Sequence, residues 1–134
     1  MDKKIEEMKK LYGDLCETFE KGEFGGIKQK EYVKLIAITI YIFGENHRKL
    51  KRETAITRIT DLMELSNSTV PEDYTRVNTN KDGRGIPRMV HHIDWSRKHM
   101  VDKDLLSTNS PKGIWELTDG GIQYSKKILP SEYH

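Results

Sequence analysis

Basic side chains are concentrated in one short segment of this chain, where they are suited to binding negatively charged groups. Residues 76–103 hold seven lysines and arginines against three aspartates, and they also hold three of the five histidines. The seven cations are Arg76, Lys81, Arg84, Arg88, Arg97, Lys98 and Lys103. Because the whole chain carries a net charge of only +2, this local excess predicts a surface that faces a polyanion.

The pattern inside this segment predicts a helix over residues 87–103 with an inner and an outer face. Small or apolar residues recur at spacings of three and four on the inner face, at Met89, Ile93, Ser96 and Met100. The outer face carries groups that suit nucleic acid, namely His91, Asp94, Arg97 and Lys98. A carboxylate such as Asp94 accepts from the amino group of cytosine in the major groove. An ion pair of Arg97 with Asp94 or Glu116 is the alternative use of that arginine.

Five further cations are predicted to bind the phosphate backbone. Arg84 and Arg88 flank the start of the helix, where free backbone N–H groups also favour phosphate. Arg76 and Lys81 lie in the preceding loop, and Lys112 lies at the tip of a later turn. Phosphate contacts of this kind position a protein on DNA without selecting a sequence.

The sequence lacks the residue patterns that metal binding, nuclease activity or nucleophilic catalysis would need. His91 with Asp94, and His92 with His99, share helical faces, but neither pair supplies three converging metal ligands. Asp94 and Lys98 have no second carboxylate beside them, as a nuclease would need. Nucleophile signatures and phosphate-binding glycine motifs are also absent. The sequence therefore predicts a protein that is not an enzyme and binds no metal or cofactor.

The composition is that of one ordinary globular domain. The longest apolar run, residues 35–43, is far shorter than the roughly 20 residues that span a bilayer. The first residues do not form the apolar block of a signal peptide. A single cysteine, Cys16, forms no internal disulfide and fits a reducing compartment. We expect a cytoplasmic protein without a membrane partner.

Three helices are predicted before the basic segment. Residues 2–21 have amphipathic spacing and lead into a Gly-rich turn that ends at residue 26. This helix packs on the domain or pairs with a second copy of the chain. Residues 28–43 fit a buried helix or a buried strand; their length and polar lead-in favour a helix ending at Gly44. Residues 51–65 form the third helix.

The segments around the basic helix complete the predicted domain, residues 27–130. Residues 66–87 are expected to form a flexible basic loop, with a helical turn after Pro71. Two antiparallel strands, 105–108 and 114–117, form a wing. Thr118 or Asp119 then caps a closing helix, and residues 131–134 are expected to fray. Core packing accounts for both tryptophans, Trp95 and Trp115. The predicted fold class is mainly α with a small β-wing: a winged helix-turn-helix preceded by an extra N-terminal helix.

Several residues also resemble the N-terminal domain of the Mrr restriction endonucleases. The resemblance rests on Ile93-Asp94-Trp95-Ser96-Arg97, on Leu105-Leu106, and on Lys112-Gly113-Ile114-Trp115-Glu116-Leu117-Thr118 with Gly121. It covers residues 88–129 well, and Asp104 stands where the family usually has glycine. The resemblance implies a DNA-binding winged helix that is joined, in the family, to a nuclease domain.

Together these observations predict a winged-helix module that binds double-stranded DNA, from a restriction or defence system or acting as a small regulator. Its helix 87–103 would enter the major groove and its wing would follow the backbone. Implied partners are duplex DNA, a second copy of the chain, and a nuclease domain or subunit. The alternative is an interaction module that uses the winged helix and the N-terminal helix without binding DNA.

Overall fold

In the described part of the chain, five α-helices pack together into a single core. The structure, a computed structural model, describes residues 3–77 and 85–134. The α-helices are α1 (Lys3–Thr18), α2 (Tyr32–Phe43), α3 (Arg52–Leu65), α4 (Arg88–Asp102) and α5 (Asp119–Ile128). Short 3-10 turns are η1 (Gln29–Glu31), η2 (Pro71–Tyr74) and η3 (Ser131–Tyr133), and the strands are β1 (Lys49–Lys51), β2 (Arg76–Val77), β3 (Ile86–Pro87) and β4 (Ile114–Glu116). The fold is therefore mainly α with small antiparallel sheets.

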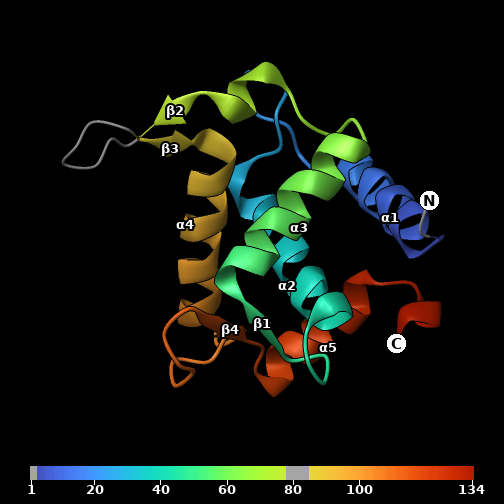
Figure 1. The fold of residues 1–134 in the computed structure, drawn as a ribbon, viewed down its shortest axis with the longest axis vertical. Coiled ribbons are helices and arrows are strands. Elements are labelled where there is room, and N and C mark those ends of the chain that lie inside the picture. Colours follow the sequence, from blue (N-terminus) through green and yellow to red (C-terminus); the bar gives the residue numbers. More distant parts are fainter. Residues whose placement is uncertain (1–2, 78–84) are drawn as a thin grey trace.

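Helix α2 lies at the centre of the molecule, and α3, α4 and α5 pack against it (Figure 1). Nine of its twelve residues are buried, which explains why its sequence is apolar on every side. The β-branched residues that also fitted a strand are accommodated because α2 is covered all round. The helix ends at Gly44, so the helical interpretation of residues 28–43 is confirmed.

Helix α1 belongs to the same core. Its inward residues Met8, Leu11, Tyr12 and Cys16 are buried in one cluster with residues of α2 to α5, and the Tyr12 hydroxyl hydrogen-bonds Thr39 of α2. The predicted boundary at residue 26 therefore does not separate two cores. The apolar face that motivated dimerisation through this helix is covered by the chain itself, while dimerisation stays a prediction.

The predicted wing forms in part, with a partner that the sequence did not indicate. Strand β4 pairs antiparallel with β1, with Leu50 opposite Trp115. The expected strand 105–108 is reduced to a bridge between Leu106 and Leu117 and a bond from the Ser107 N–H to the Glu116 carbonyl, 2.8 Å. The strand is short because Leu105 still belongs to the turn that ends α4, where its N–H donates to Met100 O at 2.8 Å.

Asp104 makes the turn that ends α4. Its φ of 60° lies in the left-handed region, which glycine adopts without cost and aspartate tolerates.

Helix α5 begins as predicted and lies very close to this turn. The Thr118 hydroxyl accepts from the Gly121 N–H at 3.0 Å, so Thr118 is the N-cap. The same hydroxyl donates to Asp104 O, and the Thr118 N–H donates to Leu105 O at 3.0 Å. A Cβ on Gly121 would lie 2.2 Å from Leu105 O, so only glycine fits.

The described parts of two segments that were expected to be mobile have regular contacts, while residues 78–84 of the expected flexible loop lie outside the described residues. In the loop 66–87, η2 forms after Pro71 as predicted, and β2 and β3 pair as a short ribbon that leads directly into α4. Residues 131–134 were expected to fray, but they form η3 and fold back on the domain. The His134 carbonyl accepts from the buried Tyr41 hydroxyl at 3.0 Å, which anchors the tail.

Candidate nucleic-acid interface

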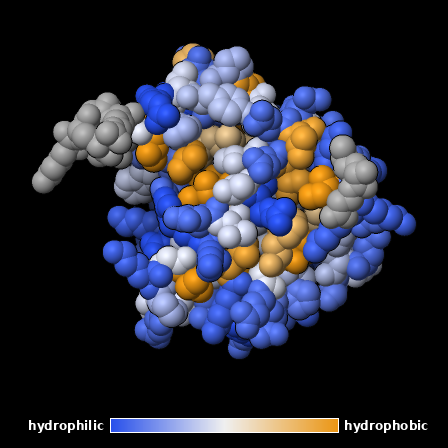
Figure 2. Space-filling view, viewed as in Figure 1, coloured by the Kyte–Doolittle hydropathy of each residue, from blue (hydrophilic) through white to orange (hydrophobic). Residues whose placement is uncertain are grey.

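The outer face of α4 presents a row of polar and aromatic side chains. At 100° per residue, His91, Trp95 and Lys98 lie opposite the buried residues Met89, Ile93 and Met100. Burial of the inner row fixes the direction of the outer row. Figure 2 shows mainly hydrophilic residues along the edge of the molecule where α4 and the following turn lie. This edge includes the outer face of the helix that the sequence predicted over residues 87–103.

Trp95 is the centre of the outer row. Its side chain is 42% exposed, so the expectation of core packing is wrong for Trp95, whereas Trp115 is buried as expected. The Lys98 ammonium lies over the Trp95 ring, 5.1 Å from its centroid, and the His91 ring meets it edge-on at 6.1 Å. These contacts hold a flat apolar surface between a cation and an imidazole.

Asp94 is tied to another helix. Both of its carboxylate oxygens accept from Nη2 of Arg52, at 2.9 and 2.8 Å. Asp94 is therefore the partner of Arg52 and not of Arg97. Arg97 is exposed on the shoulder of the row and makes no ion pair with Asp94, Glu116 or any other described residue, so the alternative use predicted for it is wrong.

Arg52 also fixes the turn of the wing. Its backbone N–H donates to the carbonyl of Gly113 at 2.9 Å, while its side chain holds Asp94. Gly113 has a φ of 82°, which suits glycine at the tip of this turn. Lys112 beside it is exposed, and so is Lys51, which pairs in register with Ile114. Arg52 therefore links the start of α3, the wing turn and the outer row of α4. We call this region the α4–wing face, and its members are Lys51, Arg52, His91, Asp94, Trp95, Arg97, Lys98 and Lys112.

The predicted phosphate contacts before α4 have a different setting. Nη1 of Arg76 donates to Gly85 O at 3.1 Å, and the Arg88 backbone N–H donates to Thr75 O at 2.8 Å. Both arginines thus hold the β2–β3 ribbon against the start of α4. Arg76 remains exposed and Arg88 is partly exposed, while Lys81 and Arg84 lie outside the described residues.

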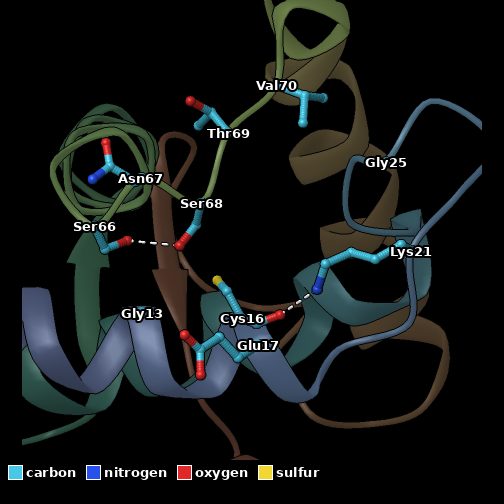
Figure 3. Close-up of a pocket in the computed structure, with 10 residues that line it drawn as sticks. All are labelled: Gly13, Cys16, Glu17, Lys21, Gly25, Ser66, Asn67, Ser68, Thr69 and Val70. Carbon is cyan, nitrogen blue, oxygen red and sulfur yellow. Dashed lines mark hydrogen bonds between the residues drawn. The ribbon is translucent and has the colours of Figure 1, made fainter.

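A cavity of about 180 Å³ lies on the far side of α3, between α1 and residues 66–70 (Figure 3). Cys16 and Lys21 both line it. Burial raises the pKa of the Cys16 thiol to about 11, so the thiol is protonated near neutral pH. The Lys21 ammonium is turned to the backbone carbonyls of Cys16 and Phe19, as Figure 3 shows for Cys16. This cavity offers no activated nucleophile.

A second cavity, of about 190 Å³, lies beside the start of α4. Asp73, Arg88 and His92 contribute to its wall. Burial raises the pKa of the Asp73 carboxyl, whose oxygen accepts from the Val70 N–H at 2.8 Å. Burial also lowers the pKa of His92, which bonds Gln29 at 3.0 Å. These polar groups connect η1, η2 and α4, and they fix the N-terminal end of the α4–wing face.

Among residues 3–77 and 85–134, no three His, Cys, Asp or Glu side chains gather in a way that could hold a metal ion. Within the same residues, no helix is long and apolar enough to cross a membrane.

Arg52 and Lys51 belong to the α4–wing face although the sequence did not indicate them, and Trp95 is exposed although burial was predicted. The basic pair Lys51-Arg52 stands at the start of the predicted helix 51–65, so its position at a helix N-terminus is visible in the sequence. The pairing of Arg52 with Asp94 joins residues 42 apart, and no local pattern indicates it. Comparison of the chain with family models, with curated proteins and with solved structures found no match.

Proposed function

We propose that this chain is a winged-helix module that binds double-stranded DNA through the α4–wing face. The observation that carries the proposal is the outer row of α4, in which Trp95 and Lys98 are exposed beside a wing turn held by Arg52. Recognition helices insert exposed polar and aromatic side chains into the major groove.

The order of the elements supports the winged-helix part of the proposal. Three helices, α2, α3 and α4, are followed by a turn, by β4 and by the closing helix α5. The turn before β4 would be the wing, and Figure 1 draws it near the C-terminal end of α4. The ribbon of β2 and β3 is an addition between the second and third helices of this plan.

In this proposal, each cation has a defined task. Helix α4 lies in the major groove, where Lys98 and His91 reach base edges or phosphates and Trp95 packs against them. Lys112 and Lys51 bind the phosphates that flank the groove, and Arg97 binds one from the shoulder of the helix. Phosphate binding dominates affinity and makes it depend on salt.

The resemblance to the Mrr N-terminal domain favours a role in a restriction or defence system, or as a small regulator. In that setting a nuclease domain or subunit is the implied partner, and a second copy of the chain would place two α4 helices on one duplex. The chemistry of cleavage belongs to that partner, and this module supplies DNA binding in the cytoplasm.

The test is duplex binding by single-charge variants. We expect Lys98→Ala and Lys112→Ala each to weaken binding and to reduce the slope of log affinity against log salt by about one. Lys9→Ala is the matched control, because it removes the same charge from α1, which Figure 1 places on the opposite side of the molecule from α4. Equal effects of all three substitutions would refute this interface.

A further inference from the structure

We propose that Asp94 is a specificity-determining residue: Arg52 holds its carboxylate in the α4–wing face, where it selects duplexes that place a base amino group, from cytosine or adenine, directly opposite it. This inference rests on the proposed function. It concerns a feature that phosphate binding leaves unexplained, an acidic side chain fixed within a surface of cations.

Asp94 is fixed from outside its own helix. Nη2 of Arg52 lies 2.9 and 2.8 Å from the two carboxylate oxygens, and the Arg52 backbone is bonded to Gly113 O. Arg52 is therefore held at its backbone and at its side chain. The position of the Asp94 carboxylate is set by α3 and the wing together, as a base contact requires.

The carboxylate keeps unused hydrogen-bonding capacity. Each ionised carboxylate oxygen has about two acceptor positions, and Arg52 occupies one on each. The Asp94 side chain is still 35% exposed and the Arg52 side chain 41%. An ionised carboxylate accepts only, so the unused positions select a donor on the DNA.

Base edges in the major groove differ in this respect. Cytosine and adenine present amino donors there, whereas guanine and the oxygen of thymine present acceptors. Facing an acceptor, the Asp94 carboxylate loses its water without gaining a hydrogen bond, and it repels nearby phosphates. Asp94 therefore acts partly by rejecting wrong sequences, as specific interfaces commonly do. Well-placed contacts of this type discriminate roughly tenfold or more.

Substitutions of the two members of the ion pair are expected to change the affinity for duplex DNA in opposite directions. Asp94→Ala removes a negative charge, so affinity for random duplex should rise about two- to fivefold, as for charges several ångströms apart in water. Arg52→Gln leaves the carboxylate uncompensated, so affinity for every duplex should fall. These directions follow from the two charges alone, so the deciding observation is base preference, which a purely structural ion pair would leave unchanged in Asp94→Ala.

The experiment selects bound duplexes from a pool with randomised base pairs, using the intact chain and these variants. The intact chain should enrich cytosine or adenine at one position, and Asp94→Ala should lose that enrichment alone. Asp102→Ala is the control: it removes the same charge from an exposed position near the outer row, where Asp102 has no ion pair with a described residue. It should tighten binding without changing the enrichment. Asp94→Asn keeps an acceptor for Arg52 and adds a donor, so it should admit guanine or thymine.

The inference is overturned if Asp94→Ala retains the enrichment, if it binds random duplex more weakly, or if the intact chain enriches no base. A failure of the intact chain to bind any duplex at low salt is a different result, because it refutes the proposed function itself. Thermal unfolding of each variant shows whether it is folded, and Asp94→Asn gives the decision if Asp94→Ala is not.

Discussion

The contact between α5 and the end of α4 should tolerate no side chain at Gly121. A Cβ at this position would lie 2.2 Å from Leu105 O and 2.9 Å from Cδ2 of Leu117. The first of these atoms is backbone, held by the Thr118 N–H at 3.0 Å, so it cannot rotate away. Relief of the clash requires α5 to move from the turn at Asp104, which also anchors the Thr118 hydroxyl.

We expect Gly121→Ala to lower the free energy of unfolding by about 3 kcal/mol, at the upper end of the usual cost of overpacking. With a urea m-value of about 2 kcal/mol/M, the midpoint of urea unfolding should fall by about 1.5 M. The assay is urea denaturation followed by circular dichroism.

Gly120→Ala is the matched control. A Cβ on Gly120 would meet its nearest atoms, Asp104 O and Thr118 Oγ1, at 3.5 Å, which is an ordinary contact. Alanine is also the better helix former, by up to about 1 kcal/mol in a helix interior. Gly120→Ala should therefore be neutral or stabilising. The reasoning is refuted if Gly121→Ala is as stable as the intact chain, or if the two variants lose equal stability.

A second prediction compares two buried tyrosines, of which Tyr12 has a hydrogen-bonded hydroxyl and Tyr32 does not. Tyr32→Phe should leave stability unchanged or raise it by about 1 kcal/mol, because the buried Tyr32 hydroxyl has no hydrogen-bond partner among the described residues. Tyr12→Phe should lower stability by about 1 kcal/mol in urea denaturation, because it removes the partner of buried Thr39; a larger loss in Tyr32→Phe would contradict this account. A third prediction concerns pH: since burial lowers the pKa of folded His92 below its usual 6.5, stability should fall as the pH drops from about 6.5 to that lower pKa. Melting temperatures of His92→Asn, which can still donate to Gln29, should fall less over this range, and equal falls would exclude His92 as the cause.

The helices could be predicted from the sequence because their signals are local. Met89, Ile93, Ser96 and Met100 are all buried, as their spacing predicted, and α4 differs from the predicted helix by one residue at each end. Thr118 caps α5 for an equally local reason, since its hydroxyl bonds an N–H three residues later.

The predicted strand 114–117 forms as β4, but β1, β2 and β3 could not be predicted in the same way, because their signals are short or distant. Lys49-Leu50-Lys51 contains one apolar residue, and it becomes β1 because β4, more than sixty residues later, pairs with it. The ribbon of β2 and β3 has only two residues on each side, too few for any periodicity.

The exposure of several cations at the candidate interface was predicted, but their arrangement was not. The charge excess indicated α4, and Lys98 and Lys112 are exposed as expected. Trp95 was misjudged because an aromatic residue at the boundary of a helical stripe fits either burial or exposure, and only packing decides. Asp94 was expected to face DNA freely, whereas the approach of α3 pairs it with Arg52. Tertiary contacts thus decided which charged side chains are paired within the protein and which are exposed without an ion-pair partner among the described residues.

Affinity for a short duplex, measured as a function of salt concentration, tests the central claim most directly. The exposed cations of the α4–wing face are Lys51, Arg97, Lys98 and Lys112. If all four neutralise phosphates, log affinity should fall linearly with log salt with a slope of about −3 to −4. No detectable binding at about 50 mM salt, or a slope near zero, would contradict the account.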